Sequence, residues 1–443
     1  MLAEQASLIG TQAAQILLLE KRIASLEDQL GLGGPPKVPP FVKANKPVGN
    51  STKKRKVRNL HFCRRREAPT RTVNHVADEC PDCGRGLSGG GPAVSRQVID
   101  MSPSAVTITD HVMHDRWCGV CKKRVRAKVD LSGEVSGKCR LGHNLISWIA
   151  NLHIEALVPL RKIQDILKRL HGVHVSIGEM TQMMDNLAAK AAPFIETLYK
   201  EVRAGRVINA DETGWRQNGQ NGYLWAISND RTRLFRFDEH RSAQVALSLI
   251  GSDFNGTLVT DFYYAYNPIP SRHQRCWPHF KRDLDKLRLH PNADAALNEW
   301  VDQVLNTWHR GREFQAFCLS KPKFGANIFD RRRRRKELEI AIYALAEPYI
   351  DANVDAIQHT LAKRIAMFLK ELFTFVEFPE VPDNNNAAER AVRPAVIARK
   401  VCGGTRSEKG SQTKMTLMSL MGTWKLRGLD PIVQCRNLLA LPP

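Results

Sequence analysis

Residues 206–211 read Arg206-Val207-Ile208-Asn209-Ala210-Asp211, a short apolar run that ends on an acidic side chain. Residues 257–261, Thr257-Leu258-Val259-Thr260-Asp261, repeat this pattern further along the chain. Runs of this kind predict short strands that are buried in a sheet. The neighbouring elements that the sequence predicts are strands at 222–228 and 232–237, a helix at 241–250 and a short strand at 274–277.

The order of these elements predicts the fold class. Three antiparallel strands, a helix and then further strands is the order of a ribonuclease-H-like α/β domain, which we expect over residues 205–400. Residues 291–380 lack strand signals and predict a helical insertion, and residues 401–443 predict a helical tail. The insertion contains five consecutive arginines, 331–335, which indicate either a solvated helix face or a contact with a nucleic-acid backbone.

Three acidic residues form the candidate site. Asp211 and Asp261 each follow a predicted strand, and Glu389 lies in the segment 384–390, which opens a predicted helix. Two carboxylates at strand ends and a third on a distant helix can converge on hard divalent cations. We therefore expect two Mg²⁺ (or Mn²⁺) ions per site, which could clamp the attacking and leaving oxygens of a phosphodiester.

The residues beside these acids suggest supporting roles. Side chains alternate along a strand, so Glu212 should face away from Asp211 and orient the site or pair with a basic residue. Asn386, Glu389 and Arg393 share one helix face, and we expect Arg390 and Arg393 to bind phosphate. The alternative for this segment is a surface helix with ordinary ion pairs.

The segment Cys276-Trp277-Pro278-His279 follows Asp261. A cysteine and a histidine three residues apart could bind zinc, but the sequence offers no evident second pair. A structural or DNA-positioning role for Cys276 and His279 is the preferred interpretation.

Composition indicates a partner of opposite charge. The 443 residues include 66 Lys and Arg against 45 Asp and Glu, a formal charge of +21, which suits a nucleic acid. Charge alone fits a basic ribosome-associated protein equally well. No apolar run is long enough to span a membrane, and no secretory signal is evident, so we expect a cytoplasmic protein.

Residues 76–130 predict a zinc-binding domain. Two Cys-x-x-Cys pairs supply four thiolates for one structural Zn²⁺, and strand-like segments at 94–99 and 106–111 predict a zinc ribbon between them. Free or redox-active thiols are the alternative. The expected ligands are Cys80, Cys83, Cys118 and Cys121.

Residues 1–30 carry a heptad pattern and predict a coiled coil, hence at least a dimer, or else an amphipathic helix packed on its own chain. The linker at 31–75 is basic, and its side chains could contact DNA phosphates or remain solvated. The residues concerned are Lys53, Lys54, Arg55 and Lys56.

Residues 140–200 predict a helical DNA-binding segment. A periodic helix at 160–170 ends at Gly172, and a capping box from Ser176 to Glu179 opens a second helix. This is the outline of a helix-turn-helix, with Gln182 on the recognition helix. An ordinary helical hairpin gives the same pattern.

Taken in order, these motifs resemble a bacterial transposase of the insertion sequence 66 family over nearly the whole chain. The residues that carry the resemblance are 211–215 (Asp-Glu-Thr-Gly-Trp), 222–225 (Gly-Tyr-Leu-Trp), 260–266, 276–279, 386–394, Arg399-Lys400, Gly403-Gly404 and 428–431. The resemblance implies that Asp211, Asp261 and Glu389 are the Asp-Asp-Glu triad. It also implies that Arg399 and Lys400 bind DNA and that Trp215 supports the site.

The family resemblance implies a function. The protein would bind double-stranded DNA in the bacterial nucleoid, cut the element ends, and join the freed 3′-hydroxyl to target DNA, aided by small companion proteins of the same element. A catalytically dead relic that still binds DNA and a structure-specific nuclease are the alternatives. The three acids favour an enzyme over the relic, and the coiled coil and tail favour a transposase over a simple nuclease.

Overall fold

The computed structural model describes residues 82–85, 106–112, 114–118, 120–126, 130–137, 139–321, 326–351 and 356–441. The chain divides into two compact units, Met1–Asp100 and Met101–Pro443, and nearly all described residues belong to the second. The predicted coiled coil, the basic linker and the strand expected at 94–99 lie outside the described residues.

A five-stranded sheet forms the centre of the second unit. Its strand order is β5-β4-β3-β6-β7, with β3, β4 and β5 antiparallel and β3, β6 and β7 parallel. Helix α5 (Ala243–Ile250) links β5 to β6, so the predicted order of elements is confirmed. The strands are β3 (Val207–Gln217), β4 (Gln220–Ser228), β5 (Arg233–Asp238), β6 (Thr257–Thr260) and β7 (Arg272–Arg275).

The strands β3 and β7 differ most from the prediction. β3 continues past Asp211 to Gln217, where Asn218 (φ 51°) and Gly219 (φ 80°) form a tight turn into β4. Positive φ at both turn residues matches the twist of the paired strands, which lets the hairpin extend beyond the apolar run. The fifth strand ends at Arg275 rather than 277, because Trp277 and Pro278 begin a helix instead.

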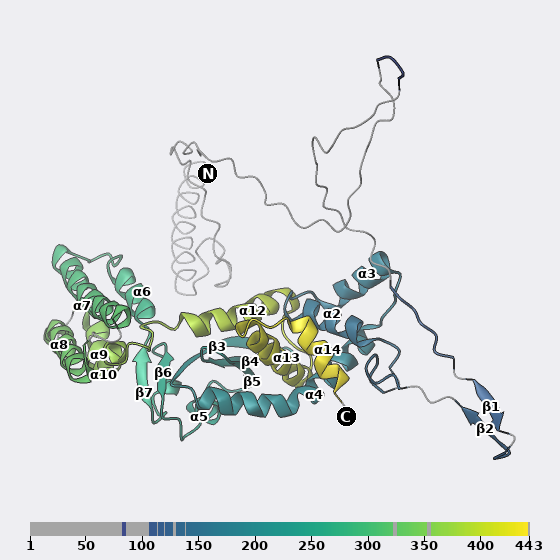
Figure 1. Ribbon diagram of the computed structural model, residues 1–443. Helices are drawn as coiled ribbons and strands as arrows, with labels where there is room; N and C mark the ends of the chain where they lie inside the picture. Colours follow the sequence, from purple (N-terminus) through teal and green to yellow (C-terminus); the bar gives the residue numbers. More distant parts are fainter. Residues whose placement is uncertain are drawn as a thin grey trace, which may run out of the picture. The chain divides into compact units, whose positions relative to one another are not determined.

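Helices surround this sheet in three groups (Figure 1). The first precedes the sheet: α2 (His143–Ile154), α3 (Leu160–His171) and α4 (Ile177–Arg203). The second follows β7: α6 (Trp277–Leu287), α7 (Ala295–Ser320), α8 (Ile328–Ala346), α9 (His359–Met367), α10 (Leu369–Leu372) and α11 (Thr374–Glu377). The third ends the chain: α12 (Asn386–Cys402), α13 (Glu408–Leu426) and α14 (Pro431–Ala440).

The described residues form two hydrophobic cores. One joins the sheet to α2–α5 and α12–α14, and the other lies among α6–α11. In the second core Trp277 stacks on Trp308, with ring centroids 5.3 Å apart. The helices expected at 291–380 are confirmed, and the group begins earlier, with α6. Figure 1 shows this group at the β7 end of the sheet, and α2 and α3 at the opposite end.

The five-arginine run lies on α8 and is largely occupied within the protein. Arg335 Nη1 and Arg332 Nε each lie 2.8 Å from a carboxylate oxygen of Glu377, the last residue of α11. Arg333 and Arg334 pair with carboxylates of α8 itself. The run therefore joins α8 to α11, a role that neither sequence interpretation included.

The predicted tail is part of the core. On α13, Ser419 Oγ accepts a hydrogen bond from Phe235 N at 2.8 Å, and Thr423 Oγ1 accepts one from Arg233 N at 3.0 Å. Both backbone groups belong to β5, the edge strand of the sheet. Side chains of α13 thereby satisfy an edge that would otherwise be open to pairing with another chain.

The predicted zinc segment is described only in part. A hairpin of β1 (Asp115–Cys118) and β2 (Lys123–Arg126) brings Cys118 to the end of a strand and Cys121 into the following turn. Residues 106–111 form no strand, so that expectation was wrong. Cys80 lies outside the described residues, and zinc binding stays a prediction.

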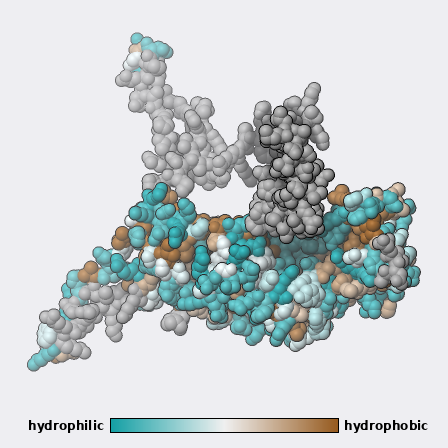
Figure 2. Space-filling view, turned by 180° about the vertical axis from the view of Figure 1, so that it is seen from behind, coloured by the Kyte–Doolittle hydropathy of each residue, from teal (hydrophilic) through white to brown (hydrophobic). Residues whose placement is uncertain are grey.

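The described surface is mainly hydrophilic on the side drawn in Figure 2, where hydrophobic residues gather in separate small patches. Within the described ranges, no helix is both long and apolar enough to cross a membrane.

Candidate active site

Asp211 lies within β3 at the centre of the sheet, opposite Ala226 of β4. Burial is the main reason that its pKa is raised, to about 8. The carboxylates of Glu212, Asp261 and Glu389 raise it further. The effect of Asp261 and Glu389 shows that the three acids singled out from the sequence share one electrostatic environment.

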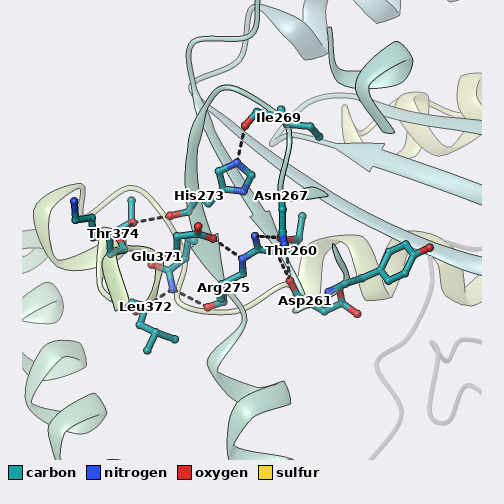
Figure 3. Close-up of polar contacts among 12 residues, drawn as sticks. Thr260, Asp261, Asn267, Ile269, His273, Arg275, Glu371, Leu372 and Thr374 are labelled. Atoms are coloured by element: carbon teal, nitrogen blue, oxygen red, sulfur yellow. Dashed lines mark hydrogen bonds and ion pairs between the residues drawn. The ribbon is translucent and has the colours of Figure 1, made fainter. Parts of the chain in front are cut away.

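Asp261 directly follows β6, and a buried arginine holds its backbone (Figure 3). Arg275 is fully buried, and its Nη1 donates to the carbonyl of Asp261 at 3.0 Å and to Thr260 Oγ1 at 3.2 Å. Its Nε donates to Glu371 of α10 at 2.6 Å, and its Nη2 to Asn267 at 2.6 Å. Every nitrogen of the guanidinium thus has a partner, as a buried charge requires.

The Asp261 side chain is ordered by its own loop, because Asp261 Oδ1 accepts a hydrogen bond from Tyr263 N at 2.9 Å. Arg275 fixes the backbone and this turn fixes the carboxylate. Arg275 stands at the end of a short strand, and nothing else in the sequence marked it as a functional residue.

Glu389 lies in the first turn of α12, and its side chain is 38% exposed. Pro394 neither ends nor interrupts this helix, which runs to Cys402. His279 of α6 approaches Glu389, with its Nδ1 3.6 Å from Oε1. Asn386, one turn earlier, is exposed.

Cys276, His279 and Glu389 bring three possible metal-binding atoms within 4.8 Å of one another. Sequence analysis found no further partner for Cys276 and His279, and Glu389 supplies one. However, burial raises the pKa of the Cys276 thiol to about 12, and its Sγ accepts a hydrogen bond from Asn385 N at 3.2 Å. A protonated, hydrogen-bonded thiol is a poor metal ligand. These contacts favour the structural role expected for Cys276.

Glu212 forms an ion pair with a basic residue, as the strand pattern suggested. Arg241 Nε lies 3.0 Å from Glu212 Oε1, and Tyr266 Oη donates to Oε2 at 2.5 Å. Arg241 also lies over the ring of Tyr263, 3.7 Å from its centroid. Arg241, Tyr263 and Tyr266 were not predicted as site residues, although both tyrosines belong to the aromatic run after Asp261.

The residues expected to contact DNA differ in their surroundings. Arg390, Arg393 and Lys400 are exposed on α12, and Gln182 is exposed in α4, where its amide bonds Asn186. Arg399 is instead half-buried, and its guanidinium bonds the carbonyl of Gly214 and lies 3.4 Å from Thr213 Oγ1. Arg399 therefore joins α12 to β3, and the DNA contact expected of it stays a prediction.

Trp215 is buried beside the same strand, and its Nε1 donates to Thr405 Oγ1 at 3.1 Å. This contact links β3 to the segment between α12 and α13, in keeping with a supporting role.

The raised pKa of Asp211 leads to a stability prediction. The folded protein binds the proton of the Asp211 carboxyl group more tightly than the unfolded chain does. This proton binding stabilises the fold near pH 4, and the stabilisation is lost as the pH rises towards 8. In metal-free protein at pH 8, Asp211→Asn should increase the free energy of unfolding by about 2 kcal/mol, less than the full shift at about 1.4 kcal/mol per pKa unit would give.

Thermal unfolding with and without Mg²⁺ checks this prediction. The difference between the two proteins should shrink towards pH 4, and Mg²⁺ should raise the midpoint of the unsubstituted protein more than that of Asp211→Asn. If the two proteins unfold at the same temperature at pH 8 and respond equally to Mg²⁺, the charges of the neighbouring carboxylates do not act on Asp211.

Comparison with known sequences gives the family. A sequence model of the transposase IS66 family matches residues 138–413. The chain is 26% identical over 325 residues to the uncharacterized protein y4qI of Sinorhizobium fredii (strain NBRC 101917 / NGR234), and the alignment covers 65% of this chain and 57% of y4qI. It is 29% identical over 158 residues to the uncharacterized protein y4jO of the same organism, and that alignment covers 36% of this chain and 45% of y4jO.

The chain is 23% identical over 395 residues to a further uncharacterized protein of that organism, y4jD, and the alignment covers 81% of this chain and 74% of y4jD. The chain thus spans little more than half of y4qI and less than half of y4jO. The family match covers more than half of this chain and contains all three acids, so the protein belongs to the transposase IS66 family.

Proposed function

We propose that the protein is a DNA transposase that cuts the ends of its element and joins the freed 3′-hydroxyl to target DNA. The observation that carries the proposal is the shared electrostatic environment of three acids from β3, the end of β6 and α12. The strand order around them is the one expected of a ribonuclease-H-like domain. The family match gives independent support.

The residues present suit hard divalent cations. Asp211, Asp261 and Glu389 offer carboxylate oxygens, the ligands that Mg²⁺ and Mn²⁺ prefer. Mutual repulsion contributes to the raised pKa of Asp211, and bound cations would offset it. When bound, two such ions would activate the attacking oxygen and stabilise the leaving oxygen of a phosphodiester.

The protein's own groups would hold the site in place around the DNA. Arg275 and the Tyr263 amide fix Asp261, and Arg241 holds the carboxylate of Glu212. Arg390 and Arg393 are exposed close to Glu389 on α12, where they could bind the flanking phosphates.

Sequence-dependent DNA binding is proposed for α3 and α4. Helix α3 buries Ile163 and Leu167 and ends at Gly172, in the left-handed conformation with φ 66°. Ser176 then caps α4 by accepting a hydrogen bond from Glu179 N at 3.1 Å. The exposed basic residues of α3 are Arg161, Lys162, Lys168 and Arg169. The proposal also retains a dimer or larger assembly, a structural Zn²⁺ and companion proteins.

Isosteric substitutions test the three acids. Asp211→Asn, Asp261→Asn and Glu389→Gln should each lower Mg²⁺-dependent cleavage and joining of element-end DNA by roughly a thousandfold or more, since several kcal/mol of charge stabilisation would be lost. DNA binding should remain. Asp302→Asn is the matched control, because that carboxylate is exposed on α7 and pairs with Arg288.

The outcomes separate the alternatives. An unsubstituted protein that binds element ends but neither cuts nor joins them would be a catalytically dead relic. Cleavage without joining would indicate a structure-specific nuclease. Near-normal joining by any of the three variants would remove that residue from the site.

Binding measurements test α3 and α4 separately. Neutralising Arg161 and Lys168 should weaken binding to all duplexes about equally and reduce the salt slope by about one for each phosphate that the variant no longer binds. Gln182→Ala should instead weaken binding to element ends by about 1–3 kcal/mol, with little effect on random duplex.

Gln412→Ala provides the matched control, because Gln412 is also an exposed helical glutamine that bonds a side chain four residues away. If Gln182→Ala lowers both affinities equally, α4 does not read sequence and the two helices are an ordinary hairpin.

A further inference from the structure

We infer that Asn385 is the residue that fixes the three acids relative to one another. The inference rests on the proposed function, because it assigns Asn385 a positioning role in the same site. Asn385 is only 1% exposed and immediately precedes α12, four residues before Glu389. Its side chain reaches β3, its backbone N–H reaches Cys276 between β7 and α6, and its carbonyl reaches the first turn of α12.

The side chain of Asn385 joins α12 to β3 next to Asp211. β6 pairs with β3 only as far as Asn209 and Val259, so the carbonyl of Ala210 lies beyond the parallel ladder. Asn385 Nδ2 donates to that carbonyl at 2.7 Å. The bond satisfies a buried backbone oxygen and holds α12 to the residue directly before Asp211.

The other half of the amide is used as well. Asn209 Nδ2 donates to Asn385 Oδ1 at 3.0 Å, and both side chains are buried. The site therefore requires a group that donates to a carbonyl and accepts from an amide at the same time, which an asparagine does without adding charge. A carboxylate here would set an oxygen against the Ala210 carbonyl.

The backbone of Asn385 joins α12 to the end of β6. Asn385 N donates to Cys276 Sγ at 3.2 Å, and Cys276 N donates to the carbonyl of Thr260 at 2.8 Å. Thr260 is the residue directly before Asp261. This explains the buried Cys276 thiol as a structural link between the second and third acids.

The connection to Glu389 is direct. Glu389 N donates to the carbonyl of Asn385 at 3.1 Å in the first turn of α12. Asn385 is thus bonded to Glu389 itself, to the residue before Asp211 and, through Cys276, to the residue before Asp261. Its loss should alter the spacing of the acids rather than their charges.

The experiment compares Mg²⁺ dependence in full-length variants. Asn385→Ala should raise the Mg²⁺ concentration for half-maximal cleavage of element-end DNA about tenfold or more, as loss of a residue that orients metal ligands does. Its affinity for that DNA should stay within about twofold, because Asn385 is buried away from the surface that would bind DNA. A shift in metal dependence at unchanged DNA affinity distinguishes positioning from a general loss of structure.

Two further variants sharpen the test. Asn209→Ala removes one hydrogen bond and should raise the Mg²⁺ concentration for half-maximal cleavage by a smaller factor than Asn385→Ala does. The double variant should be no worse than Asn385→Ala alone, since Asn209 acts through Asn385. Asn384→Ala is the matched control, because the hydrogen bonds of that side chain are to its neighbours Asp383 and Asn386.

The outcomes are distinguishable from failure of the proposed function. If the unsubstituted protein neither cuts nor joins DNA, the proposed function fails, and Mg²⁺-dependent thermal stabilisation of the same variants still tests positioning. Folded Asn385→Ala with an unchanged Mg²⁺ requirement would overturn the inference. If Asn385→Ala does not fold, Asn209→Ala decides, and an unchanged requirement there would overturn it equally.

Discussion

Carboxylates brought together beside the central strand of a sheet repel one another, and this repulsion constrains the residues around Asp211. One member of the group has partners of its own, since Glu212 is paired with Arg241 and accepts a hydrogen bond from Tyr266. Burial, and then the charges of Glu212, Asp261 and Glu389, raise the pKa of Asp211. Under the proposed function, bound divalent cations would offset this repulsion and stabilise the folded protein.

The acids come from distant parts of the chain, and neutral or fully paired groups hold them together. Asn385 links the start of α12 to β3 directly and to the end of β6 through Cys276. Arg275 links Asp261 to Glu371 of the helical insertion. Trp308 of α7 bonds Asp383, just before Asn385, at 2.9 Å. The insertion therefore contacts the segments that carry the second and third acids and is physically placed to influence both.

The sequence predicted the strands and their order and singled out three acids as candidates, because apolar runs and the acids beside them are local features. The continuation of β3 past Asp211 was not predicted, although Asn218-Gly219 is a recognisable hairpin signal. Arg275, Asn385 and Arg241 were missed because their roles depend on partners far away in the chain. The contacts of Arg399 with β3 could not be predicted for the same reason, since an exposed and a half-buried arginine look alike in a sequence.

The most direct test of the central claim is anomalous diffraction from crystals of the protein with element-end DNA and Mn²⁺. The account predicts two manganese peaks at the carboxylates, with Asp211 bound to at least one and with Asp261 and Glu389 both among the ligands. Manganese bound elsewhere, or at Cys276 and His279 without Asp211, would contradict it.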